Sequence, residues 1–167
     1  EQLGVALILF LFGLIVGSFL NVVIHRLPRG EGFITGQSHC PYCKASIAWY
    51  DLIPVFSFLF LKGRCRHCRK ALSPRYPAVE LISGLFFLLL WPEPFFLVVM
   101  EILLVLAVID LEHLVIPDSL LIALAAIGLI HERSLQHLAT GLVATGLFFL
   151  LWFLSKGAWM GFGDVKL

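Results

Sequence analysis

The sequence predicts an all-α membrane protein that crosses the bilayer several times and carries a small cytoplasmic zinc-binding module between its first and second transmembrane helices. Hydrophobic residues make up 60% of the 167 residues and charged residues only 14%, whereas soluble proteins carry about 25% charged residues. Residues 3–24 include no charged residue and are long enough to cross a hydrocarbon core of about 30 Å. Nine of the twelve lysines and arginines, and all four cysteines, lie between Arg26 and Arg75. The chain therefore has one polar, basic segment set between apolar ones.

Residues 1–24 are expected to form the first transmembrane helix, with the N-terminus outside the cytoplasm. A cleaved signal peptide would have a basic segment before a shorter apolar stretch. Here Glu1 and Gln2 precede the apolar stretch, and His25 and Arg26 follow it. The helix is therefore expected to be retained.

Four more membrane helices are predicted after the basic segment. The apolar stretches lie at residues 78–91, 95–109, 120–130 and 135–154. Proline residues or short polar segments separate them, as expected for helix ends. The excess of lysine and arginine places residues 25–77 in the cytoplasm, and residues 78–167 then comprise helices 2 to 5 and a glycine-rich segment at the cytoplasmic edge.

The four cysteines form two Cys-x-x-Cys pairs separated by 21 residues. This spacing is typical of a tetrahedral zinc site with four thiolate ligands, and the surrounding basic residues favour the thiolate form. The predicted ligands are Cys40, Cys43, Cys65 and Cys68. Two disulfides or free thiols are the alternative. His39 and His67 could replace a ligand but are interpreted as solvated loop residues.

Residues 52–61, between the cysteine pairs, read LIPVFSFLFL. Ten residues are too few to span a bilayer, and Pro54 interrupts the run. The run could lie at the membrane interface or form a small hydrophobic core for the zinc module. The sequence favours neither reading.

Asp110 and Asp164 are the candidate catalytic residues. The predicted topology puts both at the cytoplasmic edge of the membrane, although they are far apart in sequence. Two carboxyl groups held close together cannot both ionise easily, so one can act as a base and the other as an acid on a single water molecule, as in aspartic proteases. Gly161 and Gly163 remove side-chain bulk and permit positive φ, so that a peptide could approach Asp164. The alternatives are a solvated helix-end residue for Asp110 and an N-cap for Asp164.

Other acidic residues are given structural interpretations. Asp118 follows a proline at a predicted helix start and is expected to compensate the helix dipole. Asp51 is interpreted as structural, and Glu80 as a partner of loop arginines. Glu101 lies nine residues before Asp110, on the opposite helix face, and is expected to face another helix or a partly hydrated region rather than act in catalysis.

Taken together, several sequence strings resemble the bacterial type IV prepilin peptidase family over essentially the whole chain. They are GSFLNVVIHRLP at residues 17–28, the two Cys-x-x-Cys pairs, SPRYP at 73–77 with Glu80, the segment from Ile109-Asp110 to Pro117-Asp118, and GFGDVKL at 161–167. Each string alone is unspecific, but their joint order and spacing is a specific signal.

The resemblance implies a multi-pass inner-membrane aspartic protease that removes the leader of type IV prepilins or of type II secretion pseudopilins. Many members also methylate the new N-terminus with S-adenosylmethionine. By motif match, Asp110 and Asp164 are the catalytic pair and the four cysteines are the zinc ligands. Lys62-Gly63 resembles a recurring family string, which makes Gly63 a candidate of the methylation region. The expected partners are prepilin or pseudopilin substrates and membrane lipids, and no nucleic acid.

Family members normally continue past Gly-x-Gly-Asp-x-Lys-Leu with further membrane helices, so the sequence is expected to be a piece of a longer protein. Two other functions stay open. One is a Gly-x-Gly-Asp protease that cuts within the bilayer, which the zinc module fits poorly. The other is a non-catalytic membrane anchor whose zinc module recruits a secretion or pilus component.

Overall fold

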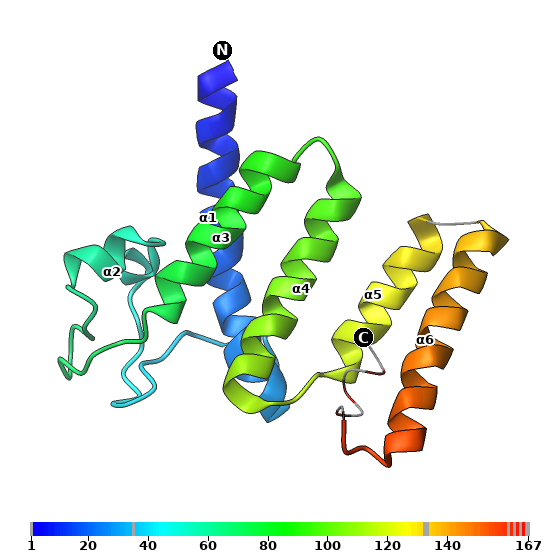
Figure 1. Cartoon of the computed structure of the whole chain (residues 1–167). Coiled ribbons are helices and arrows are strands. Elements are labelled where there is room, and N and C mark those ends of the chain that lie inside the picture. Colours follow the sequence, from blue (N-terminus) through cyan, green and yellow to red (C-terminus); the bar gives the residue numbers. More distant parts are fainter. Residues whose placement is uncertain are drawn as a thin grey trace. The chain divides into compact units, whose positions relative to one another are not determined.

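The computed structural model describes residues 2–34, 36–131, 134–159, 161, 163 and 165. Within these residues the chain is helical, and its β-structure amounts to two isolated antiparallel bridges (Figure 1). The all-α class predicted from the sequence is confirmed. The chain forms two compact units, Glu1–Val108 and Ile109–Leu167.

The first unit contains α1 (Gln2–Arg26), the zinc-module segment with η1 (Leu27–Arg29), η2 (Trp49–Leu52) and α2 (Phe56–Phe60), then α3 (Arg75–Leu90) and most of α4 (Pro94–His113). The second unit contains the end of α4, α5 (Asp118–His131) and α6 (Leu135–Ser155). Each of the five predicted membrane segments is therefore a helix. Two described stretches, Gln2–Arg29 and Pro94–His113, are long and apolar enough to cross a bilayer, while the apolar stretches Asp118–His131 and Ala139–Ser155 are shorter.

The helix ends follow local sequence. After α1 the chain tightens into η1, where Gly30 adopts a φ of 68° and donates its N–H to the Leu27 carbonyl oxygen. Only glycine enters this left-handed region without a steric penalty. A proline at its start opens α4, and Asp118 sits in the first turn of α5 after Pro117, where its negative charge is favourable. The structural interpretation of Asp118 is confirmed.

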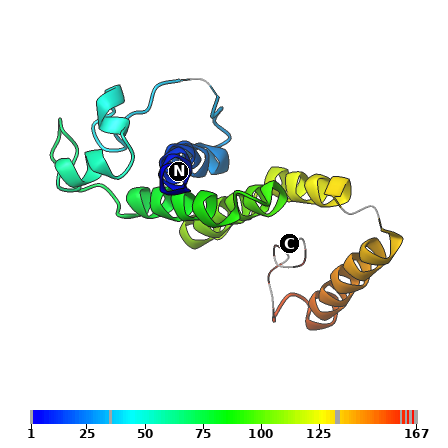
Figure 2. The same cartoon turned by 90° about the horizontal axis from the view of Figure 1, so that it is seen from above.

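Helices α1 and α3 cross in very close contact, which Figure 2 shows with α1 almost end-on and α3 passing beside it. A Cβ atom added at Gly13 would lie 2.7 Å from the Gly84 Cα atom, and one added at Gly17 would lie 2.7 Å from the Glu80 Cα atom. Real side chains do not tolerate such distances. The two backbones can therefore approach only because glycines face the crossing, as in other tightly packed apolar helix pairs.

A buried polar link lies beside this crossing. The Ser83 hydroxyl is fully buried and lies 2.8 Å from both the Gly13 carbonyl oxygen and the Glu101 Oε1 atom. Ser83 belongs to α3, Gly13 to α1 and Glu101 to α4, so one hydroxyl connects three helices. Glu101 is buried, and its prediction as a residue that faces another helix is confirmed.

We expect Gly13→Val to separate α1 from α3, because the added methyl groups would collide with the backbone of α3. Overpacking of this kind costs about 1–3 kcal/mol or more. The protein is kept in a mild detergent, and a denaturing detergent is added in steps. The measurement is the fraction of denaturing detergent at which half of the protein is unfolded. Gly4→Val is the matched control, since nothing lies within 4 Å of a Cβ at Gly4 in the same helix. Equal midpoints for the two variants would show that the crossing does not stabilise the fold.

Candidate metal centre and catalytic aspartates

The two Cys-x-x-Cys segments fold into the same small hairpin. In the first, Cys40 donates its N–H to the Ala45 carbonyl oxygen and Lys44 donates back to Cys40; in the second, Cys65 donates to Lys70 and Arg69 donates back to Cys65. One antiparallel bridge closes each hairpin, His39 to Ser46 in the first and Arg64 to Ala71 in the second. The residue after each second cysteine is left-handed, with φ 58° at Lys44 and 59° at Arg69. The turn thus presents two thiols on one side.

All four sulfur atoms lie within 4.8 Å of one another. The Cys40–Cys68 pair is 3.9 Å apart and the Cys43–Cys65 pair 4.0 Å. A disulfide would need about 2.05 Å, so all four are free thiols. Zn–S bonds of about 2.3 Å in a tetrahedron give S–S edges of about 3.8 Å, which matches these distances. The cluster fits a structural zinc ion.

The thiols of Cys65 and Cys68 have pKa values shifted in opposite directions. Backbone N–H groups of Cys68 and His67, opposed by burial, lower the pKa of Cys65 to about 6. The Lys70 N–H also favours the Cys68 thiolate, but burial and the neighbouring thiols outweigh it and raise the pKa of Cys68 to about 11. Cys65 therefore loses its proton readily, and its negative charge disfavours deprotonation of Cys68. A divalent cation removes this conflict, because it stabilises every thiolate at once.

Asp51 lies in the linker between the two cysteine hairpins and contacts the second hairpin. Arg66 donates Nε to Asp51 Oδ2 at 2.8 Å and Nη2 to Oδ1 at 2.6 Å, a two-pronged geometry that lowers the pKa of Asp51. The Arg66 guanidinium also lies 5.4 Å from the centre of the Tyr50 ring. This contact supports the structural interpretation of Asp51.

Glu80 has a different partner from the one predicted. Its Oε2 atom accepts the Val55 N–H at 2.7 Å, whereas the sequence suggested loop arginines. The Phe56 N–H bonds to the Pro54 carbonyl oxygen at 2.6 Å, which closes a γ-turn around Val55 with a φ of 62°. Such a turn is strained, above all for a β-branched residue. Glu80 is buried against α1, so it reaches the loop backbone rather than the exposed arginines.

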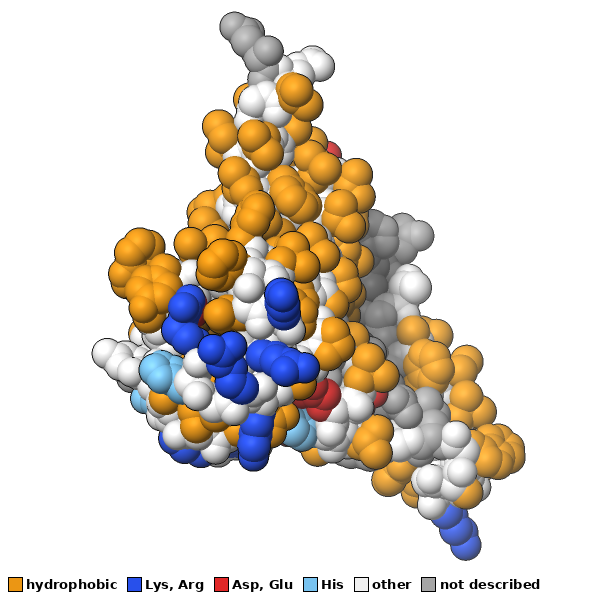
Figure 3. Space-filling model, turned by 90° about the vertical axis from the view of Figure 1, so that its left-hand side faces the viewer, with side chains coloured by type: hydrophobic (Ala, Val, Ile, Leu, Met, Phe, Trp, Pro, Cys, Tyr) orange, Lys and Arg blue, Asp and Glu red, His pale blue; other side chains and the backbone are white. Residues whose placement is uncertain are grey.

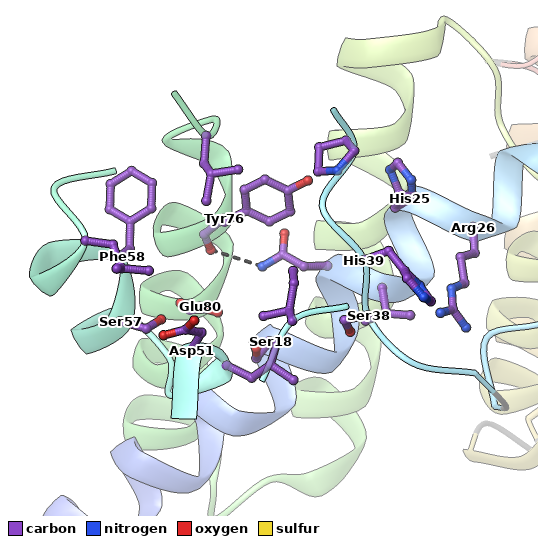
Figure 4. A pocket seen from close by; sticks show the side chains of 17 residues that line it. Ser18, His25, Arg26, Ser38, His39, Asp51, Ser57, Phe58, Tyr76 and Glu80 are labelled. Carbon is purple, nitrogen blue, oxygen red and sulfur yellow. Dashed lines mark hydrogen bonds between the residues drawn. The ribbon is translucent and has the colours of Figure 1, made fainter. Parts of the chain in front are cut away.

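A cavity of about 160 Å³ lies between the second half of α1, the zinc module and the start of α3 (Figure 4). Asn21 of α1 lines it and donates Nδ2 to the Tyr76 carbonyl oxygen at 3.0 Å. His39 also lines its rim and is exposed, which agrees with its interpretation as a solvated loop residue. His67 is exposed, as predicted, and neither histidine belongs to the sulfur cluster.

The cavity also resolves part of the ambiguity in residues 52–61. Phe58 and Leu61 turn inward and line it, so they form the small core of the zinc module. Phe56, Leu59 and Phe60 point outward and are exposed. The core reading therefore describes one face of this run, and contact of the other face with the membrane stays a prediction.

Gly63 has a structural reason to be glycine. Its φ is 66°, and an added Cβ atom would lie 3.0 Å from the Phe58 ring. Its carbonyl oxygen accepts the Leu72 N–H, which closes the second hairpin. Its assignment to a methylation region stays a prediction.

Asp110 occupies the last turn of α4 and is exposed. Its carbonyl oxygen accepts the N–H of Leu114, a residue with a φ of 52° that ends the helix. Asp164 lies outside the described residues, so its distance from Asp110 stays a prediction. Gly163, just before it, is described: an added Cβ atom would lie 3.2 Å from Cδ1 of Ile116. A side chain at this position would therefore crowd Ile116.

Sequence profiles of two domains together cover most of the chain. The profile described as bacterial peptidase A24 N-terminal domain matches residues 11–93, and that of the type IV leader peptidase family matches residues 95–167. A prepilin leader peptidase/N-methyltransferase of Klebsiella pneumoniae is 39% identical over 95% of this chain and 80% of its own length. The chain belongs to the type IV leader peptidase family. The resemblance noted in the sequence is confirmed.

Other members of the leader peptidase family are similarly related. A prepilin leader peptidase/N-methyltransferase of Myxococcus xanthus is 40% identical over 87% of this chain but only 46% of its own length. A type 4 prepilin-like proteins leader peptide-processing enzyme of Escherichia coli O78:H11 is 38% identical over 93% of this chain and 71% of its own length. No solved structure matches the chain.

Sequence reasoning missed three residues of this family member's first unit: Asn21, Ser83 and Val55. The first two carried a usable signal, because a polar side chain inside an apolar helix marks a helix contact or a functional site. Val55 carried none, since no short-range pattern in the sequence indicates its positive φ or its bond to Glu80.

We expect Asp51→Asn and Arg66→Gln each to speed the loss of zinc to a chelator by a similar factor, because each breaks the same contact between linker and second hairpin. The double variant should be no faster than the single ones. The measurement is the rate of zinc transfer to a chromogenic chelator. Arg64→Gln, a nearby basic residue outside the Asp51 contact, is the control. Purified protein without about one zinc per chain would contradict the metal assignment itself.

Proposed function

We propose that this chain is a membrane aspartic endopeptidase that removes the leader of type IV prepilins or type II secretion pseudopilins at the cytoplasmic face of the inner membrane. The names of its relatives support the reaction and the substrate class. The apolar surface supports the location: side chains such as Leu3, Ile8 and Leu142 are at least 67% exposed, which water would not tolerate over whole helices. In this proposal the N-terminus is outside, and the zinc module and the active site are cytoplasmic.

The observation that carries the catalytic assignment is the contact of Gly163 with Ile116 within the second unit. Ile116 lies six residues after Asp110, in the connection from α4 to α5. Gly163, which directly precedes Asp164 in the sequence, therefore packs against the connection that follows Asp110. Because Asp110 is exposed at the helix end, a substrate and a water molecule can reach it.

In the proposed mechanism the ionised carboxylate of the pair takes a proton from a water molecule, and the protonated carboxyl donates a hydrogen bond to the scissile carbonyl oxygen. The water then attacks the carbonyl carbon, and a carboxyl proton is delivered to the leaving amine. Asp110 and Asp164 supply both groups. Cys40, Cys43, Cys65 and Cys68 would hold a zinc ion with four thiolates and leave no position for water, so the ion would serve structure and not this chemistry.

N-methylation of the new N-terminus with S-adenosylmethionine belongs to the proposal because the relatives' names include it. The cavity of about 160 Å³ in the first unit is smaller than the 300–1,000 Å³ or so of small-molecule sites. We therefore assign the donor no binding residues beyond Gly63 as a candidate of the methylation region.

We expect Asp110→Asn and Asp164→Asn each to lower the rate of leader removal about 10²- to 10⁴-fold, because each removes one acid–base group. The measurement is cleavage of a prepilin in lipid nanodiscs by the enzyme at its natural length. Asp118→Asn, an aspartate at a helix start, is the control and should cleave at the normal rate. Normal cleavage by either active-site variant would contradict the two-aspartate mechanism and favour the non-catalytic anchor.

We expect Gly163→Ala to slow cleavage several-fold, because the new Cβ atom meets Cδ1 of Ile116 at 3.2 Å and shifts the segment that carries Asp164. Ile116→Val removes that Cδ1 atom, so the double variant should recover most of the rate. Gly146→Ala, where nothing lies within 4 Å, is the control. A double variant as slow as Gly163→Ala would show that the contact does not position the aspartate.

A further inference from the structure

The zinc module carries five apolar side chains that point away from its core. They are Trp49, Ile53, Phe56, Leu59 and Phe60, with exposed fractions between 45% and 82%. We call this set the apolar arm. Its last three members lie at spacings of three and four on α2 and so share one side of that helix, and η2, which bears Trp49, packs against α2. A module surrounded by water would not expose so many large apolar groups together.

The position of the apolar arm follows from two contacts in the first unit and from the geometry of α1. The N–H of Val55, at the start of α2, is bonded to Glu80 at 2.7 Å, and the Glu80 backbone touches α1 at Gly17. Gly17 lies nine residues before Arg26, the basic end of α1, which corresponds to about 13 Å along the helix axis. The start of α2 is therefore level with a point well inside the apolar part of α1. Figure 1 shows the same relation, with α2 beside the lower half of α1 and not below its end.

Basic side chains lie next to the apolar arm, where the surface of a bilayer would be. His25, Arg26 and Arg29 mark the inner end of α1, and Lys62 and Arg64 follow α2 directly and are exposed. Figure 3 shows lysine and arginine side chains gathered below the hydrophobic surface of this face. Apolar residues beside basic ones are the pattern of segments that lie in the interface of anionic membranes.

We propose that the apolar arm is inserted in the cytoplasmic leaflet and fixes the zinc module to the membrane surface as an interfacial anchor. The bilayer is its occupant, because the arm is level with the apolar part of α1 and is tied there by Glu80. The proposal rests on the membrane location proposed above, but not on the peptidase reaction. It explains why one face of residues 52–61 is exposed although the other lines the cavity.

Two single-tryptophan proteins test the proposal in the full-length protein, in nanodiscs that contain anionic lipid. One keeps only Trp49, and the other keeps only Trp91 at the end of α3, with phenylalanine at the other tryptophan positions. Fluorescence is quenched either by lipids brominated near the headgroup end of the acyl chain or by iodide in water. We expect bromolipid to quench both proteins, and iodide to quench Trp49 several-fold less than a free tryptophan derivative.

The outcomes separate the two claims. If bromolipid quenches Trp91 but not Trp49, the membrane location holds and the anchor is overturned, whether water or another protein covers the arm. If it quenches neither residue, the membrane location is overturned as well. If the arm is inserted only at the depth of the interface, bromine near the headgroup should quench Trp49 more strongly than bromine deep in the lipid acyl chain.

A matched pair of variants checks that the arm itself causes the insertion. In the protein with Trp49 alone, Phe60→Asp should release the arm and raise quenching by iodide several-fold. Ile34→Asp, which changes an equally exposed apolar residue outside the arm, should leave it unchanged. Zinc content per chain should stay the same in both variants, which shows that the module is still folded. Unchanged iodide quenching in Phe60→Asp with full zinc content would overturn the proposal.

Discussion

The close crossing of α1 and α3 is the contact on which the rest of the first unit depends. It exists because Gly13 and Gly17 present bare backbone to α3. The crossing brings Ser83 to the Gly13 carbonyl oxygen and sets Glu80 beside Gly17. From that place the Glu80 carboxyl group reaches the Val55 N–H and thereby holds the start of α2. The orientation of the zinc module relative to the two helices thus follows from two glycines.

Several polar groups of this unit that lie away from water find a partner in the protein, which lowers the cost of burying them. The Ser83 hydroxyl is shared by three helices, the Asn21 amide donates to a backbone carbonyl oxygen of α3, and Glu80 accepts a loop N–H. Each bond joins elements that are distant in sequence. In an apolar solvent such bonds do the work that burial of apolar surface does in water, because lipid offers no hydrophobic drive for helices to associate.

How much the sequence could predict depends on whether the determining interaction is local. The paired cysteines, the helix start at Pro117 and Asp118 and the breaks around Pro92 and Pro94 are local features, and the structure agrees with them. The partner of Glu80 could not be predicted, because a short-range pattern does not encode which glycines face α3. Residues 52–61 were ambiguous for another reason: five helical residues are too few for periodicity to separate an inward from an outward face. The pairing of Asp110 with Asp164 rests on topology and family resemblance, because Asp164 lies outside the described residues.

The same reasoning separates the role of the zinc site from that of the aspartates. Four thiolates in two hairpins of the same form would leave a zinc ion no open ligand position, so the ion would hold two loop segments together and would not activate water. The Asp51–Arg66 contact adds a second link between linker and hairpin, and the Glu80–Val55 bond ties the module to the helices. The placement of the module on the helix pair thus rests on side-chain bonds of its own linker and not on the cysteine cluster alone.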